Sequence, residues 1–69
     1  MYKLIFKIKE LRKFKGMSQK RLAYLSKLSQ SHISELETNK QSPTLKTVEN
    51  LADALKTHPD NLLEIDKNH

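Results

Sequence analysis

The chain has 69 residues, no cysteine and a formal net charge of +5, which indicates one small domain without disulfides or thiolate metal sites. No apolar run approaches the ~20 residues that a membrane span needs. Lys3 and Lys7 interrupt the apolar N-terminus too early for a signal peptide. We therefore expect a single cytoplasmic domain over residues 1–69 that does not enter a membrane.

The charge is divided unevenly along the chain. Residues 1–21 carry eight basic side chains against one acidic one, a net charge of +7, whereas residues 22–69 carry five against seven, a net charge of −2. A basic segment of this kind is typical of a surface that faces a polyanion, such as nucleic acid or lipid headgroups. A solvated charged surface has the same composition, so charge alone leaves both interpretations open.

Apolar residues recur at helical spacing almost throughout, and one Gly and two Pro leave few helix breakers. This pattern predicts an all-α fold of five helices. The first helix is expected from about Leu4 to Lys15, with a stop at Gly16. Apolar residues and lysines alternate in residues 2–8, so a short extended N-terminal arm is the alternative there.

The next two helices are expected to be short and capped by serine. Ser18 is placed to cap the second helix, which ends near Ser26, and Ser29 to cap the third, which ends near Thr38. Two capped helices that are separated by three or four residues form a helix-turn-helix. The motif covers about residues 18–38.

A loop at residues 39–43 leads to the last two predicted helices. Thr44 is expected to cap the fourth helix, and Pro59 to begin a short fifth helix. Residues 1–7 and 66–69 are expected to be loosely held. The side chains of the fourth helix expected to point inward are Leu45, Val48, Leu51, Ala52 and Leu55.

The outward face of the third helix carries small polar side chains and no Lys or Arg, although the chain is basic. A helical wheel turns Ile33 and Leu36 inward. The side chains expected to face solvent are Gln30, Ser31, Ser34, Glu35 and Thr38. In a DNA major groove Gln pairs with adenine, Ser with several bases and Glu with cytosine, so this face suits base recognition. An exposed polar helix of a small bundle is the alternative.

Two blocks, LR..KGMSQ..LA and LSQSHISELE...QSPTL.T...LA.AL, stand in this order between Leu11 and Leu55. In these blocks the chain resembles the Cro/cI-type (XRE, lambda-repressor-like) helix-turn-helix DNA-binding domains, with a looser match as far as Ile65. The resemblance implies a five-helix lambda-repressor-like bundle. It also implies a regulator of transcription, most simply a repressor, that binds double-stranded DNA through the third helix.

The resemblance further implies roles for individual residues. Base contacts are expected from Gln30, Ser31 and Glu35. Contacts with the DNA backbone are expected from Gln19, His32, Thr38, Asn39 and Lys40. Gln19 is also expected to brace Gln30, and Arg12 and Glu37 occupy the positions of a partly buried ion pair between the first and third helices.

Two positions depart from the family pattern. Lys27 stands in the turn where relatives usually carry Gly in a left-handed conformation, which costs a residue with a side chain ~1–2 kcal/mol. Glu35 brings a negative charge near DNA, where it either selects cytosine or lowers non-specific affinity.

The small core and the resemblance together favour a homodimer on a palindromic site. Dimer contacts are expected around the fifth helix, from Leu62, Leu63 and Ile65. The competing interpretation is an antitoxin or another protein-binding module on the same fold, with a toxin or a second regulator as its partner. Apolar residues near the surface, such as Phe6, Phe14 and Tyr24, would then mark the contact.

Catalysis and metal binding are not expected. His32 has serine neighbours, but no carboxylate is evidently placed to orient it and no Gly-rich turn offers oxyanion donors. The three histidines, His32, His58 and His69, do not stand at metal-ligand spacing. The sequence therefore predicts a protein that is not an enzyme and needs neither a metal nor another cofactor.

Overall fold

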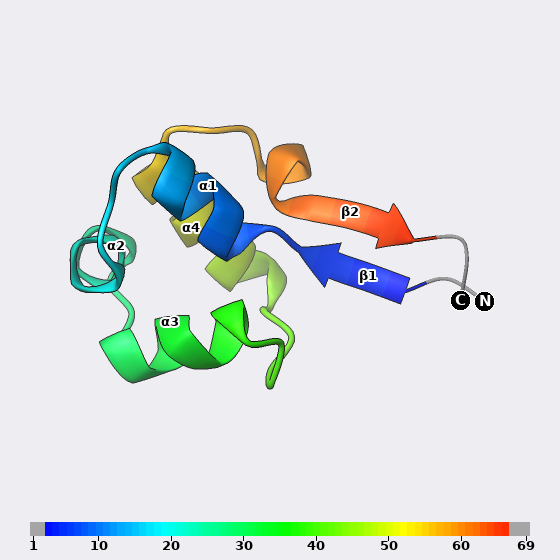
Figure 1. The fold of residues 1–69 in the computed structure, drawn as a ribbon, viewed down its shortest axis with the longest axis horizontal. Coiled ribbons are helices and arrows are strands. Elements are labelled where there is room, and N and C mark those ends of the chain that lie inside the picture. Colours follow the sequence, from blue (N-terminus) through cyan, green and yellow to red (C-terminus); the bar gives the residue numbers. More distant parts are fainter. Residues whose placement is uncertain (1–2, 67–69) are drawn as a thin grey trace.

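Four α-helices, one 3₁₀ helix and a two-stranded sheet make up residues 3–66, the part of the chain that the computed structural model describes (Figure 1). In chain order the elements are β1 (Lys3–Phe6), α1 (Ile8–Phe14), α2 (Gln19–Ser26), α3 (Gln30–Glu37), α4 (Leu45–Leu55), the 3₁₀ helix η1 (Pro59–Leu62) and β2 (Leu63–Asp66). The helices form one body, and the sheet projects from its side.

The prediction of an all-α bundle with five helices is wrong. The segment predicted as the first helix is divided into β1 and α1, and the predicted fifth helix is η1 followed by β2. The two strands pair antiparallel, with Phe6 opposite Leu63 and Ile5 opposite Glu64. The alternation of apolar residues and lysines in residues 2–8 has the two-residue period of a strand. The strand that pairs with β1 is β2, at the other end of the chain.

Parts of the two segments that were predicted to be loosely held lie outside the described residues, namely residues 1, 2 and 67–69. Within the described part, Lys3–Phe6 and Asp66 belong to the sheet. Lys7 donates its backbone N–H to the carbonyl oxygen of Leu62 at 2.8 Å. This bond ties the start of α1 to the end of η1.

The helix-turn-helix and the caps of its helices are confirmed. The side-chain oxygens of Ser18, Ser29 and Thr44 accept hydrogen bonds from the backbone N–H three residues further on, at 3.0, 3.0 and 3.2 Å. Each cap satisfies a donor that the first turn of a helix leaves free, which defines where α2, α3 and α4 begin. At the other end of α2 the buried hydroxyl of Ser26 donates to the carbonyl oxygen of Leu22 at 2.7 Å.

Lys27 ends α2 in the left-handed conformation, with φ of 62° and ψ of 32°. The chain then returns toward α2, because the N–H of Leu28 donates to the carbonyl oxygen of Ala23 at 3.0 Å. The turn thus has the left-handed geometry that the resemblance implies for this position, and the Lys27 side chain is exposed.

Replacing Lys27 with glycine is expected to stabilise the fold by about 1 kcal/mol, since glycine removes a left-handed strain of ~1–2 kcal/mol but adds some freedom to the unfolded chain. Lys20→Gly is the control, because Lys20 is an exposed residue inside α2 and should lose about 1 kcal/mol there. Urea unfolding of both variants measures these changes. Loss of stability in Lys27→Gly would show that the lysine turn is not strained.

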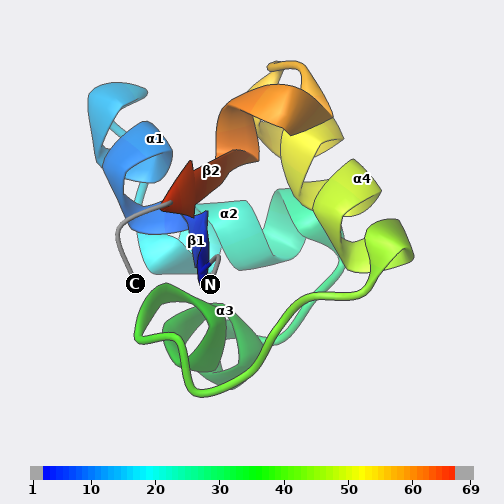
Figure 2. The ribbon, with the colours of Figure 1, turned by 90° about the vertical axis from the view of Figure 1, so that its right-hand side faces the viewer.

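The core lies where α1, α2, α3, α4 and η1 meet, with α2 packed against both α3 and α4 (Figure 2). The small side chain of Ala23 is buried on α2. The other buried apolar residues are Ile8, Leu22, Ile33, Leu36, Leu51, Ala52, Leu55 and Leu62. Leu45, predicted to point inward, is instead 77% exposed, because it is the first residue of α4. No helix in residues 3–66 has both the length and the apolar character needed to cross a membrane.

Candidate nucleic-acid interface

One side of α3 is buried and the other forms the edge of the molecule (Figure 1). Ile33 and Leu36 face the core, which leaves the polar side of the helix toward solvent. The side chains of Gln30, Ser31 and Ser34 are exposed, and Glu35 is half-buried. The residues predicted to contact bases therefore lie on one accessible strip along α3.

The end of α3 presents the residues predicted to contact the DNA backbone. Thr38 donates its hydroxyl to the carbonyl oxygen of Ser34 at 3.0 Å, which keeps this side chain against its own helix. Asn39 has φ of 60°, a left-handed conformation that asparagine tolerates well, and it turns the chain away from α3. Lys40, which follows, is exposed. His32 lies half-buried on the first turn of α3.

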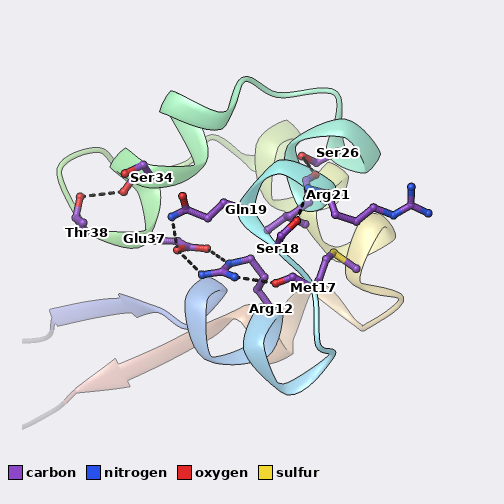
Figure 3. Close-up of polar contacts among 10 residues, drawn as sticks. Arg12, Met17, Ser18, Gln19, Arg21, Ser26, Ser34, Glu37 and Thr38 are labelled. Carbon is purple, nitrogen blue, oxygen red and sulfur yellow. Dashed lines mark hydrogen bonds and ion pairs between the residues drawn. The ribbon is translucent and has the colours of Figure 1, made fainter.

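Arg12 and Glu37 join α1 to α3 through a bidentate ion pair (Figure 3). Arg12 donates from Nε to Oε2 of Glu37 at 2.6 Å and from Nη2 to Oε1 at 3.1 Å. The two side chains are 10% and 2% exposed. The third donor, Nη1 of Arg12, bonds the carbonyl oxygen of Met17 at 2.7 Å, so the same guanidinium also holds the chain between α1 and α2.

Gln19 completes this polar cluster. Its Nε2 donates to Oε1 of Glu37 at 2.9 Å, so the Gln19 amide braces Glu37 (Figure 3). The contact with Gln30 that the resemblance implied stays a prediction. The carboxylate accepts three hydrogen bonds from two different helices. The orientation of α3 is therefore set by the polar pair Arg12 and Glu37 with Gln19, as well as by the apolar core.

The cluster lowers the pKa of Glu37. Burial of the side chain by itself would raise this pKa. Hydrogen bonds from Arg12 and Gln19, together with the positive charges of Arg12 and Lys9, outweigh burial, and the pKa falls below its ordinary value of 4.5. The charged form of Glu37 is the one that the fold stabilises.

The stability of the fold should consequently fall in acid. A carboxyl group with a lowered pKa in the folded state contributes stability above its unfolded pKa, and this contribution is lost as the pH drops through the folded pKa. We expect the difference in melting temperature between the wild type and Glu37→Gln to be largest near neutral pH and to shrink below the ordinary pKa of 4.5. Thermal melts from about pH 7 to about pH 3 measure it. A constant difference would show that Glu37 does not titrate as described.

The residues predicted for a dimer interface do not all face solvent. Leu62 is buried in the core of its own domain, so its side chain is not available to a second copy. Leu63 and Ile65 on β2 are 39% and 52% exposed. The correction follows from η1, which turns Leu62 inward before β2 leads the chain away from the body.

A profile of the helix-turn-helix family matches residues 8–62 of the chain. The chain belongs to the XRE-type helix-turn-helix family. Membership places it among DNA-binding regulators of transcription. The match begins at α1 and ends with η1, so it covers the four helices and leaves out both strands.

Solved structures of XRE-type regulators are similar to this one. The restriction-modification controller protein C.AhdI from Aeromonas hydrophila is 38% identical, with a TM-score of 0.79, over 81% of this chain and 85% of that one. The wild-type controller protein C.Esp1396I is 36% identical, with a TM-score of 0.73, over 80% of this chain and 71% of that one. No curated protein sequence matches the chain.

A third solved structure has the same fold at lower identity. The clp gene regulator ClgR from C. glutamicum is 24% identical to this XRE-type chain, with a TM-score of 0.76, over 80% of this chain and 71% of that one. At this identity the comparison shows the fold alone. It adds a gene regulator, beside the two controller proteins, to the structures that share the arrangement of α1–α4.

Proposed function

We propose that this protein is a repressor that binds a palindromic DNA operator as a homodimer, with α3 of each copy in a major groove. The observation that carries the proposal is the exposed polar strip on α3 in a chain of the XRE-type family. A helix without long cations approaches base edges closely, which suits the recognition helix of a helix-turn-helix. This role places the protein in the cytoplasm.

Gln30, Ser31 and Glu35 are proposed to contact the bases. Gln30 begins α3 and Ser31 follows it, so both stand at the N-terminal end that a recognition helix directs at base edges. Glutamine can bond adenine through two atoms at once, and the serine hydroxyl can donate or accept. Glu35, one turn further along, is proposed to accept a hydrogen bond from cytosine.

The DNA backbone is proposed to lie along the two ends of the motif. Gln19 stands at the start of α2, and Thr38, Asn39 and Lys40 stand at the end of α3. His32 is proposed to lie against the sugar-phosphate chain. Arg12 is not a candidate for a phosphate contact, because its guanidinium is held by Glu37 and Met17 inside the domain.

Leu63 and Ile65 are proposed to take part in the dimer contact. Both are apolar side chains on β2 that the monomer leaves partly exposed, at the edge of a sheet of only two strands. Two copies joined in this way would bind half-sites about one helical turn, ~34 Å, apart. Occupation of a promoter by such a dimer would block transcription without a further domain.

The Lys40→Ala variant tests the phosphate contacts. Loss of one such contact is expected to weaken binding to every duplex alike and to reduce the slope of log K against log salt by about 0.9 for each protein copy. The matched control is Lys56→Ala, because Lys56 is also exposed but follows the far end of α4. Fluorescence anisotropy at several salt concentrations measures the slope. An unchanged slope in Lys40→Ala would remove Lys40 from the interface.

A further inference from the structure

A groove runs between α2 and the C-terminal part of α4. Its larger hollow has a volume of about 490 Å³ and its smaller hollow about 150 Å³. Leu25 and Asp53 line both, so the two hollows form one elongated depression. The DNA-binding role proposed above makes no use of it.

The apolar part of the lining belongs to the larger hollow; apart from Leu25, the smaller hollow is lined by polar side chains. The apolar side chains are those of Met17, Leu25, Ala54 and Leu55. Leu55 is buried beneath the others, whereas Leu25 remains 37% exposed. Leu25 therefore offers the apolar surface that a bound side chain would cover.

Basic side chains surround the apolar lining. Four of them line the two hollows against a single acid, Asp53; they are Lys15, Arg21, Lys27 and Lys56. The guanidinium of Arg21 lies 5.9 Å from the centre of the Tyr24 ring, and Tyr24 is 76% exposed. The groove thus combines an apolar interior with a positive rim and an aromatic side chain beside it.

The groove lies away from the face that α3 offers to DNA. α4 begins at the loop that follows α3 and runs away from it, so Asp53 and Lys56 stand at the far end of the helix (Figure 2). Arg21 extends from α2 on the side opposite Gln19 and Glu37 (Figure 3). A molecule in the groove would leave α3 free.

We propose that this groove binds an acidic amphipathic segment of another protein. Apolar side chains of the segment would cover Leu25, and Asp or Glu side chains on either side would pair with Arg21 and Lys56. A second copy of this chain docked by the same surface would set its four basic side chains against the same four, which like charges oppose. A nucleic acid backbone would leave the apolar lining without a partner.

A synthetic peptide tests the proposal directly. It has about 12 residues, with Leu at positions i, i+3, i+4 and i+7 and Glu at most others, so that it forms a helix with one apolar face. Titration into ¹⁵N-labelled protein is expected to shift the amide signals of Leu25, Ala54 and Leu55. A peptide with every Leu replaced by Ser is expected to bind at least about tenfold more weakly.

Charge-reversal variants show whether the rim is responsible. Arg21→Glu is expected to weaken binding of the Leu peptide at least tenfold, whereas Lys20→Glu, its exposed neighbour outside the groove, is expected to change it less than about twofold. Lys56→Glu provides the same test from α4 if the first variant does not fold, as judged from its amide spectrum.

Four outcomes would overturn the proposal. The first is the absence of amide shifts at the groove, and the second is equal binding of the Ser peptide and the Leu peptide. The third is equal weakening of binding by Arg21→Glu and Lys20→Glu, which would mean general charge attraction. The fourth is movement of the groove amides on adding duplex DNA, or on raising the protein concentration without peptide, which would assign the groove to DNA or to a second copy. The first three outcomes leave DNA recognition by α3 unaffected.

Discussion

Replacing Arg12 with alanine is expected to destabilise the fold by about 3–5 kcal/mol, because it leaves the Glu37 carboxylate buried without its charged partner. The Glu37 side chain is only 2% exposed and would keep a single donor of the cluster, Gln19. The Met17 carbonyl would also lose its bond to Nη1. In a domain of this size such a loss is a large part of the total stability. Urea unfolding at neutral pH measures it.

Lys13→Ala is the matched control, since Lys13 is the next residue of α1 and is exposed. It should change the stability by no more than about 0.5 kcal/mol. Removing both charges, with Arg12→Met and Glu37→Met together, should recover much of the loss, because no buried charge is then left unpaired. An Arg12→Ala protein as stable as the control would show that the pair does not hold α1 to α3.

Gln30→Ala is expected to cost about 1–3 kcal/mol in binding to the preferred operator, and to relax the preference at one base position in each half-site. The physical reason is the loss of a bidentate bond to one base, which a wrong base cannot form. Competition between duplexes that differ at single positions measures both effects.

Gln41→Ala is the control for this substitution, because Gln41 is also an exposed glutamine but lies in the loop after α3. It should leave the base preference unchanged. If Gln30→Ala weakens binding equally for all sequences, Gln30 contacts the backbone rather than a base.

The helix-turn-helix could be predicted because its signals are local. Ser18 and Ser29 each cap the helix that follows, and the spacing of apolar residues between them fits two short helices. The left-handed turn at Lys27 was expected only from the resemblance, since lysine itself does not favour it.

The pairing of the strands could not be predicted in the same way, although the alternation in residues 2–8 left an extended N-terminal arm open. β1 is stable because β2, about sixty residues further along the chain, supplies its partner, and no local pattern reports such pairing. A short apolar run cannot be assigned to a helix or a strand by its periodicity alone, so Leu63 and Ile65 were interpreted as the end of a helix.

The site shows the same division between local and distant information. The exposed positions of Gln30 and Ser31 follow from the helical wheel of α3. The bond from Gln19 to Glu37 and the bond from Arg12 to the Met17 carbonyl depend on how three elements meet. Leu62 was assigned to a dimer interface, but it is buried in the core of its own domain. Its burial depends on the turn at η1, which the sequence pattern does not show.

Selection of bound duplexes from a random DNA pool, at near-physiological salt, tests the central claim most directly. The proposed mode of binding predicts recovery of a palindrome whose half-sites lie about one helical turn, ~34 Å, apart. Selection with Gln30→Ala should then recover the same palindrome with one position per half-site relaxed. Recovery of no preferred sequence, with binding that disappears as salt rises, would contradict operator recognition by α3 and leave only general charge attraction.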